Sequence, residues 1–235
     1  MSEPALITKN LIERIECLTA NPEGINDIAV GRIRKDIENL QRVAMVDGIM
    51  AQGMLDSALL KKVDAVKHFD QAMKISGHDQ VVAKNYVIAL IRLGLFRQAY
   101  QVLSELPDKH DPFYKDNALH IGKYSAGLTA AENDPSGYEI ATTAQKLGLD
   151  DRQTMGILAL AASHLVQHGY AVRGTRVLGL EGRIVHFLLS NADAQKMADL
   201  EYSLAESIVD NGFDISGFTV CYSGMKSWES ERKIF

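Results

Sequence analysis

The amino-acid sequence predicts a mainly α-helical protein, an α-α superhelix of helical hairpins that ends in a small C-terminal β-α-β element. Three observations support this fold class. Apolar residues recur at helical spacing along most of the chain, similar side chains return at an interval of 34 residues, and the C-terminal part holds two short runs of apolar and β-branched residues. A fixed interval of this length is typical of stacked helical hairpins.

The composition fits a globular protein and argues against several classes of function. Of the 235 residues, 46% are hydrophobic and 23% are charged, and the formal net charge is −5. A mildly acidic chain has no overall attraction for nucleic acid or for an anionic membrane surface, and no stretch approaches the roughly 18 apolar residues of a membrane span. Cys17 and Cys221 form no CxxC motif, so we expect a soluble protein of the reducing cytoplasm.

Residues 1–44 are expected to form an N-terminal helical hairpin. Each helix has an apolar stripe at helical spacing: Ile7, Leu11, Ile15 and Leu18, then Val30, Ile33, Ile37 and Leu40. The other side of the second helix carries four basic residues: Arg32, Arg34, Lys35 and Arg42. Asp36 and Glu38 interrupt this basic cluster, which favours a solvated helix face over a nucleic-acid site.

Residues 45–182 carry the 34-residue interval. It separates three pairs of residues: Ala65 and Ala99, Phe69 and Leu103, Ala72 and Leu106. These stretches resemble tetratricopeptide repeats, whose unit is 34 residues in two antiparallel helices. The resemblance implies a small residue in the first helix, supplied by Gly53, and a turn residue between the helices, supplied by Gly94. It also implies an alanine at the close helix contact, supplied by Ala65 and Ala99.

Beyond residue 112 the resemblance is weaker, and it implies two further repeats before residue 182. Helices are expected over Asn117–Ala131, Tyr138–Leu147 and Asp151–His168. Gly169 would make the last turn, and Leu178 would be the apolar residue of the final helix.

Residues 183–235 are expected to form a small α/β cap on the repeats. Gly174, Gly179 and Gly182 disfavour a helix before it, and residues 184–189 and 218–222 are typical of buried strands. An apolar stripe between them predicts a helix capped by Asn191 or Asp193: Met197, Leu200, Leu204 and Ile208. This order predicts a parallel strand pair with a right-handed crossover. Because both strands are apolar on successive positions, we also predict a homodimer through this sheet.

No sequence motif predicts catalysis, and fingerprints of nucleotide-binding loops, metalloproteases and serine hydrolases are missing. His164 and His168 would share a helix face, but no carboxylate or cysteine accompanies them as a further metal ligand. His186 and Cys221 would have to face each other across the sheet to act as base and nucleophile. A buried cysteine that packs as a small hydrophobe is the simpler interpretation. We therefore predict no enzyme activity, no catalytic residue, no metal ligand and no cofactor.

The resemblance implies a concave groove formed by the first helices of the repeats. By register it would be lined by Met50, Met54, Lys84, Ile88, Ile91, Arg92, Leu119 and Lys123. Taken singly, each of these residues fits core packing equally well. Together they make an apolar surface with a few basic residues, which suits an amphipathic helix or an extended apolar segment.

The predicted function is therefore a protein–protein interaction module, such as an adaptor, a bacterial-style chaperone or a regulatory scaffold, whose partner is another protein or peptide. Membrane and nucleic acid are not expected as partners. The alternative is an enzyme or small-ligand-binding unit in the C-terminal β-α-β element. Its site would lie at the carboxyl ends of the two strands, near Ser190 and Asn191 and near Ser223 and Gly224.

Overall fold

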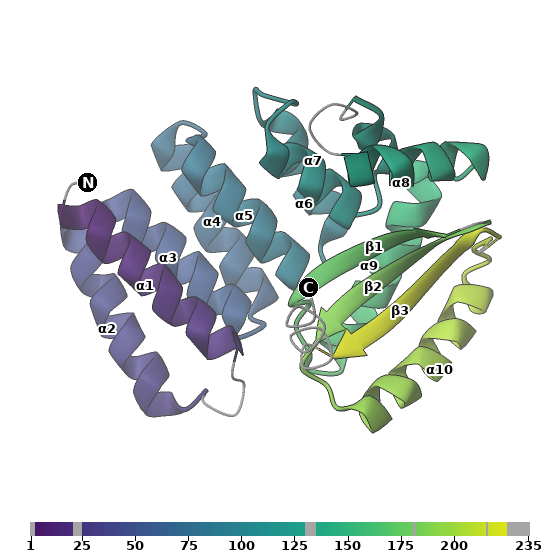
Figure 1. Ribbon diagram of the computed structural model, residues 1–235. Coiled ribbons are helices and arrows are strands. Elements are labelled where there is room, and N and C mark those ends of the chain that lie inside the picture. The colour runs from purple at the N-terminus through teal and green to yellow at the C-terminus, as the bar shows by residue number, and fades with distance from the viewer. Residues whose placement is uncertain (1–2, 21–24, 130–134, 181, 215, 225–235) are drawn as a thin grey trace. The chain divides into compact units, whose positions relative to one another are not determined.

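The computed structural model describes residues 3–20, 25–129, 135–180, 182–214 and 216–224 (Figure 1). The described chain is mainly helical, with a three-stranded sheet near its C-terminal end. It divides into two compact units, Met1–Leu93 and Gly94–Phe235. The division falls at the turn between the helices of the expected second repeat. No helix among the described residues has the length and apolar character needed to cross a membrane.

The first unit consists of five helices: α1 (Glu3–Ala20), α2 (Asp27–Val43), α3 (Met45–Ala58), α4 (Lys62–Ser76) and α5 (Gln80–Arg92). α3 packs against each of the other four, so it is the central helix of the unit. Short connections join α3 to α4 and α4 to α5, and helices joined in this way run antiparallel. The starts of α3 and α5 therefore lie at the same end of the unit as the end of α4.

Local signals in the sequence account for these helices. The side chain of Asn26 accepts a hydrogen bond from the backbone N–H of Ala29 and caps α2. The apolar stripe expected in α2 is buried along its whole length, from Val30 to Leu40. The stripe expected in α1 is only partly buried, because Leu11 and Ile15 are covered and Ile7 is exposed.

α3 and α4 form the first hairpin of the expected repeats, and they pack closely. Ala65 and Phe69 of α4 are completely buried. Gly53 of α3 lies against the ring of Phe69, which in turn stacks on Tyr86 of α5 with ring centroids 4.8 Å apart. A side chain at residue 53 would therefore push the two helices apart.

The second unit combines helices with the sheet. Its helices are α6 (Phe96–Glu105), α7 (Pro112–His120), the short 3-10 helix η2 (Tyr124–Thr129), α8 (Pro135–Lys146), α9 (Asp151–Gln167) and α10 (Ala194–Asp210). Its strands are β1 (Gly174–Leu180), β2 (Arg183–Ser190) and β3 (Phe218–Gly224). α8 and α9 correspond to the helices expected over 138–147 and 151–168.

Two expectations for the later repeats are wrong. The helix expected over Asn117–Ala131, whose last two residues lie outside the described residues, is broken, because α7 ends at His120 and η2 follows. Gly122 has a φ of 86° at the break, a conformation that favours glycine. The final repeat helix is a strand instead, because the segment that contains Leu178 forms β1 and pairs antiparallel with β2.

The sheet has the order β1-β2-β3. β2 and β3 are parallel, with His186 opposite Val220, so the expected parallel pair is confirmed. The expectation of only two strands is wrong, because β1 adds an antiparallel neighbour to β2. The expected stripe of α10 is buried, and of the two candidate caps it is Asp193 that accepts a hydrogen bond from the N–H of Lys196, at 2.8 Å.

One face of the sheet packs on helices and supplies the core of the second unit. Ile184, His186 and Leu188 alternate along β2 and are completely buried, as strand periodicity requires. α7 and α8 contact β1, while α9 and α10 contact β3; Figure 1 shows α10 running beside β3. The hydroxyl of Tyr222 donates to the carbonyl of Ala161 at 2.8 Å and ties β3 to α9.

Candidate functional site

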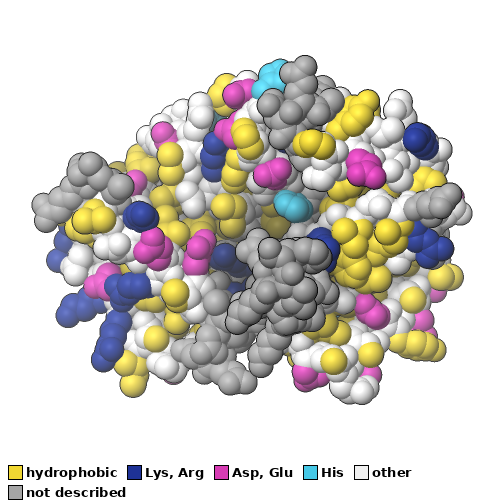
Figure 2. All heavy atoms as spheres, in the orientation of Figure 1, with side chains coloured by type: hydrophobic (Ala, Val, Ile, Leu, Met, Phe, Trp, Pro, Cys, Tyr) yellow, Lys and Arg dark blue, Asp and Glu magenta, His cyan; other side chains and the backbone are white. Residues whose placement is uncertain are grey.

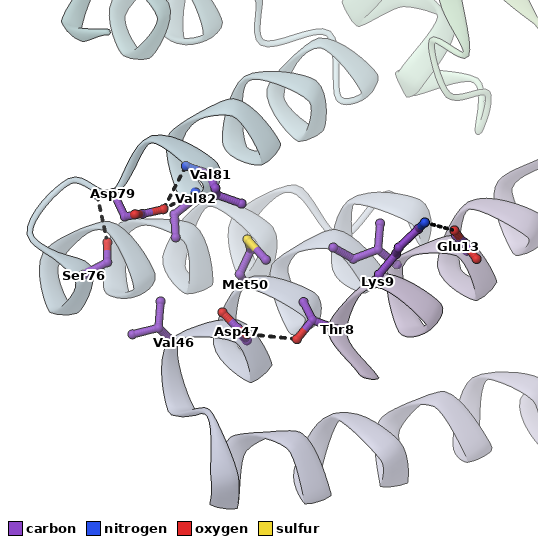
Figure 3. Close-up of a pocket in the computed structure, with 11 residues that line it drawn as sticks. Thr8, Lys9, Glu13, Val46, Asp47, Met50, Ser76, Asp79, Val81 and Val82 are labelled. Carbon is purple, nitrogen blue, oxygen red and sulfur yellow. Dashed lines mark hydrogen bonds and ion pairs between the residues drawn. The ribbon is translucent and has the colours of Figure 1, made fainter. Parts of the chain in front are cut away.

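A pocket of about 640 Å³ opens on the first unit (Figure 3). It is bounded by α1, by the start of α3, and by the end of α4 with the start of α5. Its lining residues are Thr8, Lys9, Ile12, Glu13, Val46, Asp47, Met50, Ser76, Asp79, Val81 and Val82. This volume is within the range of pockets that bind ligands in proteins.

The floor of the pocket is apolar. Met50 is only 1% exposed and lies between the side chains of α5 and those of α1, as Figure 3 shows. Val82 is also buried, whereas Ile12 and Val46 are half-buried. Val81 stands at the rim with 60% of its surface exposed. The pocket therefore offers apolar contact that is partly open to water.

The rim is polar, and its side chains are held by local bonds. The hydroxyl of Thr8 donates to Oδ2 of Asp47 at 2.9 Å. Oδ1 of Asp79 accepts from the backbone N–H groups of Val81 at 2.8 Å and Val82 at 3.2 Å, which caps α5. The N–H of Asp79 itself donates to the hydroxyl of Ser76 at 3.2 Å.

An ion pair completes the rim on α1. Nζ of Lys9 lies 3.9 Å from Oε1 of Glu13, and both side chains are about 60% exposed. A pair exposed to this degree contributes little to stability, so both side chains remain able to turn toward a bound molecule.

Of the eight residues expected to form a groove, only Met50 is among the residues that line this pocket. Met54 is completely buried, and Lys84, Ile88 and Ile91 are half-exposed on α5. Arg92 is buried, with Nη1 3.5 Å from the hydroxyl of Ser57.

The remaining two residues of that set, Leu119 and Lys123, belong to the second unit. Leu119 is buried in α7, and Nζ of Lys123 lies 3.0 Å from Oδ2 of Asp151. The eight residues are thus divided between the two units, six in the first and two in the second.

Sequence reasoning missed the contribution of α1 and the two aspartates. Thr8 could have been recognised as a polar residue on an apolar helix face. It lies three residues before Leu11 and seven before Ile15, so its hydroxyl interrupts their apolar stripe. Asp79 was recognisable as a helix cap. Neither signal indicated that the starts of α3 and α5 lie beside α1, which is a result of tertiary packing.

The basic cluster expected on α2 is a solvated face. Arg32, Arg34 and Lys35 are exposed, and dark blue side chains gather over α2 in Figure 2. Asp36, within the cluster, pairs with Arg14 of α1 at 2.6 Å and links the two helices.

A second group of polar residues lies inside the other unit. The hydroxyl of Tyr124 is 2.9 Å from Nδ1 of His186, and both side chains are buried. Burial, with a smaller contribution from the nearby His120, lowers the pKa of His186 to about 3. The imidazole is therefore neutral at pH 7, and the pair joins η2 to β2 without access for a substrate.

The Cys–His arrangement is ruled out by the register of the sheet. His186 pairs with Val220, while Cys221 pairs with Phe187. Because successive strand residues point to opposite faces, His186 and Cys221 lie on opposite faces of the sheet. Burial and the nearby Glu201 raise the pKa of the Cys221 thiol, which also disfavours a thiolate nucleophile.

His164 of α9 takes part in a hydrogen-bonded network with α10 and β3. Its Nε2 lies 3.0 Å from the hydroxyl of Ser203 in α10, and its Nδ1 lies 3.3 Å from the hydroxyl of Tyr222 in β3. Nδ1 of His168 bonds to the carbonyl of His164 at 2.8 Å, so both histidines are engaged within the fold. Within the described ranges, no three His, Cys, Asp or Glu side chains form a group able to hold a metal ion.

The strand ends proposed for the alternative function are closely packed. Ser190 is completely buried and lies opposite Gly224 in the parallel pair. A Cβ on Gly224 would lie 3.4 Å from Cε of Met197 at the start of α10. A methionine side chain therefore occupies space beside the strand end where a ligand would sit.

Comparison with family models, with curated proteins and with solved structures finds no match for this chain.

Proposed function

We propose that the protein is an interaction module that binds a segment of another protein in the pocket of the first unit. The observation that carries this proposal is the apolar floor around Met50, open to water beside the exposed Val81. Pockets that join an apolar floor to a few polar groups are the usual binding sites of proteins. Methionine suits such a floor because its flexible thioether adapts to differently shaped partners.

Exposed apolar residues beside the pocket favour a protein segment over a small molecule. Met45 is 54% exposed, Ile75 is 43% exposed and Val81 is 60% exposed. They lie at the start of α3, the end of α4 and the start of α5, which share one end of the unit. Apolar surface gathered next to a pocket extends the contact area beyond its volume, and such surface marks protein-binding sites.

The packing of α3 on α4 supports a repeat-like architecture of the tetratricopeptide kind for the first unit. Gly53 against Phe69 and the buried Ala65 agree with the close helix contact that the resemblance implies. A stack of such hairpins displays the first helices of successive pairs on one surface. Most pocket residues come from α1, α3 and α5, which are the first helices of successive pairs, while Ser76 belongs to the end of α4. An adaptor, chaperone or scaffold role fits such a surface.

A library of random 12-residue peptides displayed on phage, selected against the full-length protein, tests the proposal. Selected peptides are then titrated into protein labelled with ¹³C in its methionine methyl groups. We expect the resonance of Met50 to shift and those of Met155 and Met197, in the second unit, to stay in place.

Two matched variants locate the binding surface. Val81→Gln removes exposed apolar surface at the rim without adding charge, and we expect it to weaken binding at least tenfold. Val63→Gln is the control, because Val63 is 79% exposed at the other end of α4. Peptides that bind without moving the Met50 resonance, or that bind the Val81 variant as tightly as the wild type, would refute the proposal.

A further inference from the structure

We propose that the segment bound in the pocket is cationic, an amphipathic stretch that carries Lys or Arg beside its apolar side chains. The inference rests on the proposed function and adds the chemistry of the partner. It starts from the charged residues of the lining, of which three are acidic and one is basic: Glu13, Asp47, Asp79 and Lys9.

The one basic residue lies beside an acidic one. Lys9 pairs with Glu13 on the adjacent turn of α1, so these two charges largely cancel for a molecule in the pocket. Asp47 and Asp79 remain, and they accept hydrogen bonds from a hydroxyl and from backbone N–H groups. The lining therefore keeps a charge of about −2 before the backbone is considered.

The helix ends reduce this charge without reversing it. Asp47 lies in the first turn of α3, and Asp79 is the N-cap of α5. Each helix N-terminus acts as roughly half a positive charge, so the two together offset about one of the two negative charges. A net charge of about −1 remains in the pocket, which favours a cation and opposes an acidic partner.

The positions of the two aspartates fit a partner with both apolar and basic side chains. Figure 3 shows Asp47 and Asp79 on different sides of Met50. Their hydrogen bonds use Oδ2 of Asp47 and Oδ1 of Asp79, so each carboxylate has a second oxygen that takes no part in them. An apolar side chain placed over Met50 would thus have an acceptor for Lys or Arg on either flank.

This partner differs from the one implied by the sequence register. Lys84, Arg92 and Lys123 were expected to make the groove basic, but none of the three is among the residues that line the pocket. Without these three cations, the net charge of the surface changes from positive to negative.

Two fluorescein-labelled amphipathic peptides of 14 residues test the inference on the full-length protein. Both carry the same leucine pattern, and the other positions are Lys in one peptide and Glu in the other. We expect the Lys peptide to bind at least tenfold more tightly by fluorescence anisotropy, to shift the Met50 methyl resonance, and to lose affinity as salt increases.

Charge-neutral variants assign the preference to the pocket. Asp47→Asn together with Asp79→Asn should reduce the preference for the Lys peptide by about tenfold. Asn keeps an acceptor for Thr8 and is as good an N-cap as Asp, so the fold should be preserved, which circular dichroism checks. The control is Glu38→Gln with Asp64→Asn, which removes the same charge from exposed positions of α2 and α4 outside the lining.

The outcomes separate the two proposals. If both peptides bind equally and both shift Met50, the cationic partner is refuted while the proposed function stands. If the control pair lowers binding as much as the pocket pair, the attraction comes from the overall charge of −5 and the inference is also refuted. If neither these peptides nor the library peptides move Met50, the proposed function fails and the inference fails with it.

Discussion

A Cβ atom added to Gly53 would lie 2.7 Å from Cδ2 of Phe69, so the backbone of α3 lies directly against an aromatic ring of α4. The ring cannot move aside easily, because it is completely buried and stacked on Tyr86. This contact holds together the helices that carry the floor of the pocket.

Gly53→Ala should therefore destabilise the first unit by about 1–3 kcal/mol through overpacking, although alanine is the better helix former. Gly31→Ala is the matched control on α2, because a Cβ there has no atom within 4 Å, and it should stabilise by up to about 1 kcal/mol. Urea unfolding of both variants measures the difference. Equal effects of the same sign would show that α3 and α4 are not in close contact.

Ala65→Trp and Ala99→Trp should each cause a large loss of stability. Both alanines are completely buried in helices, one in α4 and one in α6, and an indole ring does not fit where a methyl group is already enclosed. Ala205→Trp is the control, since Ala205 is exposed on α10. Thermal melts of the two buried variants within about two degrees of the wild type would contradict this packing.

Acid should destabilise the second unit through His186. Its pKa is lowered to about 3 in the folded chain, whereas the unfolded chain takes up the proton near pH 6.5. The contribution of the neutral His186 to the free energy of unfolding is therefore complete above pH 6.5. It is lost as the pH falls from there toward 3, at up to about 1.4 kcal/mol per pH unit.

His186→Gln should flatten this part of the pH dependence, because glutamine does not titrate and keeps an acceptor for Tyr124. Tyr124→Phe is the comparison variant, which removes the 2.9 Å hydrogen bond but leaves the histidine in place. Denaturant unfolding between pH 7 and pH 4 measures both. If the free energy of unfolding falls with pH equally in the wild type and the His186 variant, this histidine does not cause the loss of stability in acid.

Truncation after Gly182 should unfold the second unit and spare the first. β1 pairs only with β2 within the described sheet, so residues 94–182 would keep a strand without its partner and a helical face without its sheet. Methyl NMR of the truncated chain should lose the native resonance of Met155 and retain that of Met50. A fragment 1–182 that melts like the full chain would mean that the sheet is dispensable.

The helices and strands with strong local patterns were predictable from the sequence. The apolar stripe of α10, its start after Asn191 or Asp193, and the paired strands β2 and β3 all follow from periodicity and capping. These features depend on neighbours in the chain, which a sequence displays directly.

β1 and the break after α7 were not predictable in the same way. Leu178 lies between glycines that disfavour a helix, but its segment becomes a strand because β2 supplies the hydrogen-bonding partner. Gly122 ends the regular structure because its backbone approaches α9, where its carbonyl accepts from the hydroxyl of Thr154 at 2.7 Å. Both outcomes depend on residues that are distant in the sequence.

The residues of the pocket were likewise predictable only in part from the sequence. The resemblance to tetratricopeptide repeats implied Met50 as a binding residue, and Asp79 has the residue type and position of a helix cap. Only the packing of α1 on α3 and of α3 on α5 brought Thr8, Asp47 and Asp79 to one apolar floor.

The sequence by itself determined that the chain is mainly helical, where α8, α9 and α10 lie, and that two apolar strands pair in parallel near the C-terminus, because periodicity and caps act over a few residues. The tertiary structure decided the third strand, the division after Leu93 and the sign of the charge in the pocket. Burial, strand pairing and the clustering of charges depend on contacts between residues far apart in the chain. These contacts contribute to the free energy of folding only when the helices have packed.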